Sequence, residues 1–237
     1  MRQKSDRKKL EEGRCLGEGR EYVGFLKANE AKSIGTASEI WDPIEKRTVD
    51  VLSQSEKTLF WCLRYSDRVA EIKEQMLMNA SIVEEICRCR GFRIPTNILS
   101  TDFLVTHTDG TSVAYSVKAD RDEFNRDSDR YRLHPNHYNK LLIRQTIECD
   151  YWKRHGTDFR IIFGSDLNKV YARNIEICMG WYDRCYVTDT ESKLKYLLAH
   201  KWIDLPMDTE PLRFARLAQI MKDEIEAKYK EAGLCRN

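Results

Sequence analysis

No stretch of this 237-residue chain approaches the roughly 18 consecutive apolar residues that a membrane-spanning helix requires. The first sixteen residues are polar and lack the apolar segment of a secretory signal. Hydrophobic residues make up 41% of the sequence and charged residues 33%, which is an ordinary balance for a globular protein. These features argue against a membrane span and favour a protein that works in the cytoplasm.

The chain also lacks an excess of charge of either sign, because 40 Lys and Arg residues nearly balance 38 Asp and Glu residues, for a net charge of +2. Tight binding to nucleic acid depends largely on basic residues that displace counterions from the phosphates. A chain so close to neutrality is a poor candidate for binding DNA tightly by itself. If it acts on DNA, another component should bring it there.

The eight cysteines include no Cys-x-x-Cys pair, and several fall within predicted helices or strands. This spacing predicts reduced, mostly buried thiols rather than a disulfide framework. A zinc site built around Cys87 and Cys89 is an alternative that the spacing leaves open. The sequence also lacks internal repeats and low-complexity segments, so its length fits one large domain or one domain with an appendage.

Hydrophobic periodicity and turn residues predict helices that alternate with strands, the order of a mixed α/β core. Residues 119–136 are polar and are predicted to be a mobile loop on the DNA side. Predicted helices cover residues 53–64, 81–90, 137–155, 168–179, 194–201 and 211–232. Predicted strands cover residues 69–78, 99–105, 111–118 and 159–163, and residues 33–52 are predicted to form a hairpin that turns at 42–46.

The most informative segment is a predicted hairpin over residues 99–118. Two β-branched and aromatic runs flank an Asp109-Gly110 pair, which is a strong hairpin signal. If the turn centres near Asp109, Asp102 and Ser116 lie opposite each other, because each is seven residues from the centre. Side chains alternate between the two faces of a strand, so Asp102, Ser116 and Lys118 are expected on one face.

Two interpretations of this hairpin remain open from spacing alone. An Asp and a Lys across an exposed hairpin can be a solvated ion pair that contributes little. The same pair is also the central part of a metal-dependent phosphodiesterase site. There the carboxylate holds a hard divalent cation, and the lysine stabilises charge around the attacking water and the phosphate.

Two further carboxylates are candidates for the same site. Glu56 lies three residues after Ser53, the spacing of a capping box that closes a helix N-terminus, and this structural role is compatible with a second role at a sheet edge. Glu148 falls on the margin of the apolar stripe of the helix predicted over 137–155. An inward glutamate needs a partner, which a metal site or a salt bridge to Lys118 would supply. A snorkelling surface glutamate is the alternative.

The chain resembles the TnsA family, the endonuclease subunits of bacterial heteromeric transposases, whose catalytic core has a type II restriction endonuclease fold. The resemblance covers roughly residues 10–182, in order and with similar spacing. The matching words are Leu52-Ser53 with Glu56, Val69 with Ile72 and Glu74-Gln75, Ser100-Thr101-Asp102-Phe103-Leu104-Val105, Val117-Lys118, and Glu148 with Tyr151-Trp152.

Position by position, the resemblance implies that Glu56, Asp102 and Lys118 are the catalytic acid, acid and lysine, and that Glu148 is a further acidic residue of the site. The implied cofactor is Mg²⁺, with Mn²⁺ as a substitute, and Glu56, Asp102 and Glu148 are its implied ligands. The family has a longer polar residue where this chain has Ser116, and serine is a poorer metal ligand. The backbone carbonyl of Val117 or a water would then take that coordination place.

The resemblance further implies a restriction-endonuclease-like nuclease domain over residues 1–185, with a mixed sheet flanked by helices, and a short helical C-terminal segment over 186–237. The implied function is cutting the 5′ ends of a transposon in the bacterial cytoplasm, at the nucleoid. The implied partners are a DDE-type transposase subunit and an ATP-dependent transposition regulator. The alternatives are a stand-alone restriction- or phage-type nuclease of the same fold and a catalytically eroded assembly adaptor, for which Ser116 is the best argument.

Overall fold

The computed structural model of the chain describes residues 5–30, 36–184 and 186–233, and these form two compact units. Unit 1 comprises the described residues of Met1–Lys57 and Asp67–Leu167. Unit 2 comprises those of Thr58–Ser66 and Asn168–Asn237. The nuclease domain predicted over residues 1–185 is defined by function, and a division of the chain into compact units does not test it. It stays a prediction.

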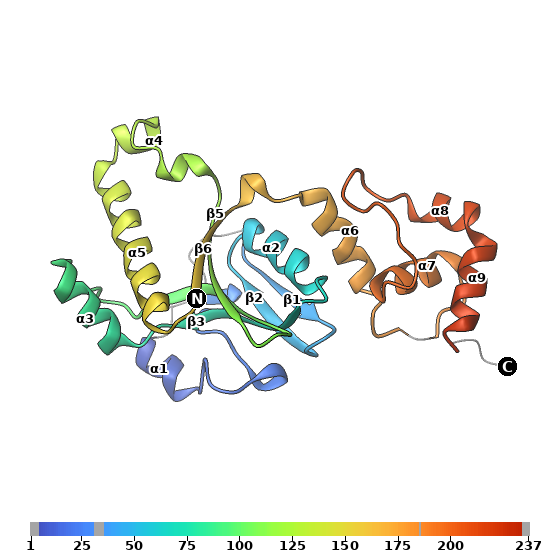
Figure 1. Cartoon of the computed structure of the whole chain (residues 1–237), viewed down its shortest axis with the longest axis horizontal. Coiled ribbons are helices and arrows are strands. Elements are labelled where there is room, and N and C mark those ends of the chain that lie inside the picture. Colours follow the sequence, from blue (N-terminus) through green and yellow to red (C-terminus); the bar gives the residue numbers. More distant parts are fainter. Residues whose placement is uncertain (1–4, 31–35, 185, 234–237) are drawn as a thin grey trace. The chain divides into compact units, whose positions relative to one another are not determined.

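A four-stranded mixed sheet forms the centre of unit 1 (Figure 1). Its strands lie in the order β3 (Val69–Leu77), β4 (Ser100–His107), β5 (Ser112–Lys118) and β6 (Asp158–Phe163). The first three are antiparallel neighbours, and β6 lies parallel to β5. The 20-residue helix α5 (Pro135–Arg154) supplies the crossover that a parallel pair needs. The predicted mixed α/β class, a restriction-endonuclease-like sheet flanked by helices, is confirmed.

The helices α3 (Ala80–Arg90) and α5 lie side by side against the sheet (Figure 1). Asn79 begins α3 by accepting hydrogen bonds from the backbone N–H groups of Ser81 and Ile82, and Gly91 ends it in the left-handed conformation at φ 67°. The buried side chains between helices and sheet come from both layers: Met78, Val83, Ile86, Cys87, Ala114, Ile147, Tyr151 and Trp152. Burial of this apolar surface fixes α5 on the sheet.

A second, two-stranded sheet precedes the central one. Strands β1 (Ser38–Asp42) and β2 (Arg47–Val51) are antiparallel, with Asp42 opposite Arg47, so the turn predicted at 42–46 is confirmed. The first residues of the hairpin predicted from residue 33 lie outside the described residues. Helix α2 (Gln54–Arg64) follows directly, with Ser53 accepting a hydrogen bond from the backbone N–H of Glu56. The N-terminal segment adds α1 (Asp6–Glu11), η1 (Gly19–Glu21) and η2 (Ala28–Glu30).

Two predicted segments differ from the structure. Residues 119–136 contain the short helices η3 (Arg121–Phe124) and α4 (Asp129–Arg132). Asp120 begins η3 by accepting from the backbone N–H of Asp122, and the buried Tyr131 ring packs against Tyr138. The helix predicted over 211–232 is divided into α8 (Phe214–Ile220) and α9 (Lys222–Glu231), because Met221 leaves helical geometry at φ −101°.

Unit 2 is helical in its described part. It contains α6 (Lys169–Met179), α7 (Thr190–Ala199), α8 and α9, with Leu194, Leu197 and Ile225 fully buried. The buried Asn174 ties α6 to the loop that follows α7, because its amide donates to the carbonyls of Met207 and Glu210. None of the described helices in either unit is long and apolar enough to span a lipid bilayer.

Candidate active site

The β4–β5 hairpin has the predicted register. Phe103 pairs with Tyr115 and Leu104 with Ala114, so the hairpin centres on Asp109. Gly110 takes φ 83°, which a glycine adopts without strain, and Asp109 accepts from the backbone N–H of Thr111. One pair beyond Phe103 and Tyr115, the same register sets Asp102 opposite Ser116. There the carboxylate Oδ2 of Asp102 accepts a hydrogen bond of 2.6 Å from the backbone N–H of Val117.

Lys118 at the end of β5 is held by its own strand. Its ammonium donates to the hydroxyl of Ser116 at 2.7 Å and to the carbonyl of Val117 at 3.0 Å. Ser116 and Lys118 therefore share a face, as predicted from strand alternation. Ser116 is only 1% exposed, so the serine acts here as an acceptor that orients the lysine.

Glu56 lies in the first turn of α2 and takes part in a capping box. Its backbone N–H donates to the hydroxyl of Ser53, which donates in turn to Oε1 of Glu56 at 2.8 Å. Oε2 accepts from the backbone N–H of Leu52. The pKa of Glu56 is raised to about 7, chiefly by burial and also by the nearby negative charge of Asp102, while the hydrogen bonds of the cap and the charge of Lys118 oppose the shift. Glu56 therefore both caps the helix and faces Asp102.

Glu148 is 2% exposed on the inner face of α5, as predicted. Its ion-pair partner is Arg144, one helical turn earlier, rather than Lys118. The Nε of Arg144 lies 2.6 Å from Oε1 of Glu148. The same guanidinium donates to the carbonyl of Ser100 at 2.6 Å. Burial raises the pKa of Glu148, the charge of Arg144 opposes this, and Asp102 adds to it. Glu148 is thus close enough to interact with Asp102 and Lys118 electrostatically.

The structure brings the four predicted side chains to the ends of β4 and β5, from two strands and two helices. Among the described residues, however, no three His, Cys, Asp or Glu side chains are gathered closely enough to hold a metal ion by themselves. Cys87 is buried and Cys89 exposed, so the zinc alternative has no support in this part of the chain.

The oxygen donors nevertheless fit hydrated Mg²⁺. That ion prefers carboxylate, carbonyl and water oxygens, and it keeps several waters, so one or two carboxylates suffice. Asp102, the carbonyl of Val117 and one of the two glutamates supply such a set. Oε2 of Glu148 is also buried, with no hydrogen-bond partner among the described residues. An acceptor oxygen left in this state is one that a cation or its water can use.

Gln75 is a residue of this site that the sequence did not single out for a role. It lies on β3 between Glu74, which pairs with Phe103, and Met76, which pairs with Thr101, and so faces Asp102 across the ladder. Its Nε2 donates to Oε2 of Glu56 at 3.4 Å, and its Oε1 accepts from Ser100 at 3.1 Å. Its φ of 48° is unusual within a strand. The resemblance includes Gln75 among its matching segments, but nothing in the sequence predicts its left-handed backbone or its hydrogen bond to Glu56.

Gly164 allows the helix that carries Glu56 to approach the sheet. It begins η4 (Gly164–Asp166), directly after β6, and a Cβ at this position would lie 2.0 Å from the hydroxyl of Ser55. The carbonyl of Ala119, just after β5, would be 3.2 Å away. The first turn of α2 therefore packs on the ends of β5 and β6 only because residue 164 has no side chain.

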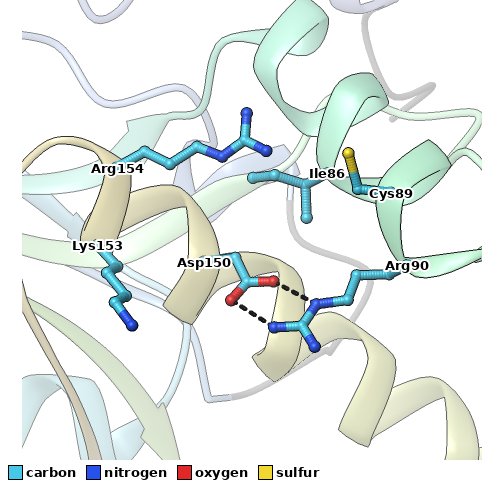
Figure 2. Close-up of a pocket in the computed structure, with 6 residues that line it drawn as sticks. All are labelled: Ile86, Cys89, Arg90, Asp150, Lys153 and Arg154. Carbon is cyan, nitrogen blue, oxygen red and sulfur yellow. Dashed lines mark hydrogen bonds and ion pairs between the residues drawn. The ribbon is translucent and has the colours of Figure 1, made fainter.

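A separate hollow of about 360 Å³ between α3 and α5 is lined by none of these residues. Figure 2 shows that the guanidinium of Arg90 makes two hydrogen bonds to the carboxylate of Asp150 across it. Arg154 is paired with Glu85, and the basic residues lie in the last turns of their helices, where they complement the helix dipoles. This hollow is accounted for by packing and ion pairs.

A mixed sheet with an acid and a lysine on neighbouring strands, and with acids on flanking helices, has the organisation of a restriction-endonuclease-like nuclease. Comparison with known proteins agrees. Residues 66–164 match the family model described as TnsA-like endonuclease N terminal. The chain is also 25% identical over 174 residues to the transposon Tn7 transposition protein TnsA of Escherichia coli.

That alignment covers 71% of this chain and 60% of the relative. The chain thus spans about three fifths of the length of the curated relative that it matches. Together, the two matches support the resemblance predicted from the sequence: the chain is similar to TnsA proteins, and its residues 66–164 match the model of their N-terminal endonuclease region.

Proposed function

We propose that this chain is the Mg²⁺-dependent DNA endonuclease subunit of a heteromeric transposase, and that it cuts the 5′ ends of a transposon during cut-and-paste transposition. The observation that carries the proposal is the meeting of Asp102, Lys118 and Glu56 at the end of the β4–β5 hairpin. The match to a TnsA-like endonuclease and the similarity to a transposition protein support the choice of DNA as substrate.

Each side chain has a role that its position supports. Asp102 and the carbonyl of Val117 would hold the metal ion, together with Glu56, Glu148 or both. When bound, Mg²⁺ or Mn²⁺ supplies Lewis-acid polarisation of the phosphate and a more acidic water. Lys118 stabilises the charge that develops on the phosphate, and Ser116 holds the lysine in place. Arg144 orients Glu148 through the ion pair at 2.6 Å.

The partners follow from the same resemblance. A DDE-type transposase subunit cuts the 3′ ends and recognises the end sequences, and an ATP-dependent regulator couples both nucleases to target choice. The net charge of +2 supports delivery by a partner, because it provides little unaided affinity for DNA. The proposal also locates the protein at the nucleoid in the bacterial cytoplasm.

The test combines the chain with its DDE partner, Mg²⁺ and a donor plasmid that carries the transposon ends, and maps the cleaved strands by primer extension. Asp102→Asn and Lys118→Ala should each lower 5′-strand cleavage by at least about a hundredfold, because each removes charge from the reacting centre. Cleavage of the 3′ strand should persist, which would give joined rather than excised products. The matched control is Asp150→Asn, which breaks the surface pair with Arg90 and should leave both cuts intact.

The alternatives give different results in the same assay. A stand-alone nuclease of this fold would cut DNA without the partner and would still be inactivated by Asp102→Asn. An assembly adaptor with an eroded site would support excision equally well with and without Asp102. Clean excision by Asp102→Asn would therefore refute the proposed chemistry.

A further inference from the structure

Three buried polar atoms on one face of α5 have no hydrogen-bond partner among the described residues. They are Nε2 and Oε1 of Gln145 and Oε2 of Glu148. Gln145 is 6% exposed and Glu148 is 2% exposed, so bulk water does not satisfy them. Buried polar groups in native proteins nearly always have a partner, and a cluster without one indicates a missing water, ion or ligand.

This face of α5 looks onto the candidate active site. Gln145, Glu148 and Trp152 are spaced by three and four residues, so they lie on one side of the helix. Trp152 at the far end of the face donates from Nε1 to the hydroxyl of Thr101 at 2.7 Å. Glu148 in the middle interacts with Asp102 and Lys118. Gln145 continues the same face by one turn.

The three atoms together define the chemistry of what would bind there. The carboxylate oxygen of Glu148 only accepts, so a free anion such as a phosphate is repelled from it. The amide of Gln145 is neutral and can accept through Oε1 as well as donate through Nε2. A hydrated divalent cation suits both groups, because its bound waters are strong donors and its charge attracts the carboxylate.

We propose that Gln145 is a positioning residue whose Oε1 accepts a hydrogen bond from a water bound to the divalent cation that Asp102 and Glu148 hold. The inference rests on the proposed function, since it concerns the same cation. Gln145 touches the cation only through that water, and with Glu148 it fixes the orientation of the hydration shell. Outer contacts of this kind typically change metal affinity by ten- to a hundredfold when they are removed.

The test measures Mn²⁺ binding to the purified full-length chain, by the electron paramagnetic resonance signal of free Mn²⁺. Gln145→Met keeps the length of the side chain and removes both polar atoms. We expect it to raise the Kd for Mn²⁺ by about tenfold or more. Without metal, its thermal midpoint should equal or exceed that of the wild type, because two unpaired buried atoms are gone. Gln219→Met, the same change at an exposed position of α8, is the control and should alter neither quantity.

A second variant tests the site in the opposite direction. Gln145→Glu replaces the amide by a carboxylate of the same shape, so it should lower the Kd for Mn²⁺ if residue 145 faces the cation. It should also lower the thermal midpoint without metal, because it buries a further negative charge. This variant answers the question even if Gln145→Met does not fold.

Asp102→Asn distinguishes the cation site itself from the role of Gln145 at that site. If Asp102→Asn weakens Mn²⁺ binding while both variants at 145 bind as the wild type does, the cation site stands and the role of Gln145 is overturned. A wild-type chain that binds no Mn²⁺ would overturn the metal-dependent function, and this inference with it. Weaker binding by Gln145→Met and tighter binding by Gln145→Glu would support the inference.

Discussion

The carboxylate of Glu56 is buried beside Asp102, and the cost of burying its charge, increased by the negative charge of Asp102, appears as the raised pKa of Glu56, about 7. A neutral glutamine at this position would remove that cost and keep one of the two acceptor oxygens that the cap uses. Retention of the acid therefore favours a role that needs charge. Residues under such a functional constraint commonly lower the stability of the fold that holds them.

Glu56→Gln should change stability in a pH-dependent way. Because folding raises the pKa of Glu56 from 4.5 to about 7, the protonated form is favoured in the folded state. This contribution to stability is complete below about pH 4.5 and is lost as the pH rises to 7, by about 3 kcal/mol at most. In the absence of metal, Glu56→Gln should therefore be more stable than the wild type by about 1–3 kcal/mol at pH 8, after the loss of part of the cap.

The measurement is urea denaturation at pH 5 and pH 8 with a chelator present. At pH 5 the variant should have no such advantage, because the wild-type carboxyl is then largely protonated. An advantage of the same size at both pH values would mean that the charge of Glu56 is not the cause.

Gln75 combines a strained backbone with a hydrogen bond to the same glutamate. A side chain at φ 48° costs about 1 kcal/mol relative to glycine, and the site keeps it nonetheless. Gln75→Gly and Gln75→Ala both remove the bond to Glu56, but only glycine relieves the backbone. We expect Gln75→Gly to be more stable than Gln75→Ala by about 1 kcal/mol, the reverse of the usual order within a strand. Chemical denaturation of the two variants measures this, and an alanine variant of equal or greater stability would contradict it.

At the scale of elements, the sequence predicted the parts of the molecule where local signals agree. The Asp109-Gly110 turn and two β-branched runs specified the register of β4 and β5, and with it the meeting of Asp102, Ser116 and Lys118. The inward position of Glu148 followed from helical periodicity. The partner of Glu148 did not, because Arg144 is polar and partly exposed and so takes no part in the apolar stripe that placed Glu148. The short helices η3 and α4 were missed because neither has a periodic stripe: a single side-chain cap at Asp120 begins η3, and packing of Tyr131 holds α4.

The sequence also provided no means of predicting contacts between elements that are distant along the chain, and the contact of Gly164 with Ser55 is the clearest case. We predict that Gly164→Ala destabilises the protein by about 1–3 kcal/mol, because the new Cβ would lie 2.0 Å from the hydroxyl of Ser55 and the first turn of α2 must shift. The same shift moves Glu56, so the Kd for Mn²⁺ should rise as well. Denaturation and Mn²⁺ titration of the one variant measure both effects.

Gly180→Ala is the matched control. Residue 180 follows α6 at φ −62°, and a Cβ there would meet nothing closer than 3.5 Å. It should cost little or nothing in stability and leave Mn²⁺ binding unchanged. If Gly164→Ala behaved like Gly180→Ala, the close approach of α2 to the end of β6 would not be what positions Glu56.

At the scale of the whole molecule, the chain passes between its two compact units more than once. Helix α2 holds Glu56 in its first turn, within unit 1, and continues into Thr58–Ser66, which belongs to unit 2. Within unit 2 this segment is well anchored: the hydroxyl of Tyr65 donates to the carbonyl of Leu198 at 2.6 Å, and the Tyr65 ring packs edge-on against Tyr171. Phe60 is fully buried. The C-terminal residues thus stabilise the helix that carries a candidate catalytic acid.

A chain that ends at Leu167 should therefore fail as a nuclease, even though it keeps every candidate site residue. Without residues 168–237, the segment Thr58–Ser66 loses the rest of its unit, including the contacts of Tyr65 with Leu198 and Tyr171. The buried side chains of Leu59, Phe60 and Trp61 should then become more exposed, and exposed apolar clusters of this kind promote aggregation. We expect the truncated chain to elute as aggregates in size-exclusion chromatography, to lack a cooperative thermal transition and to lose Mn²⁺ binding. Tyr65→Phe is the graded control, because loss of one hydrogen bond should cost only about 1 kcal/mol and leave the metal affinity intact. A monomeric, cooperatively folded chain ending at Leu167 that binds Mn²⁺ as the full chain does would show that unit 1 positions Glu56 by itself.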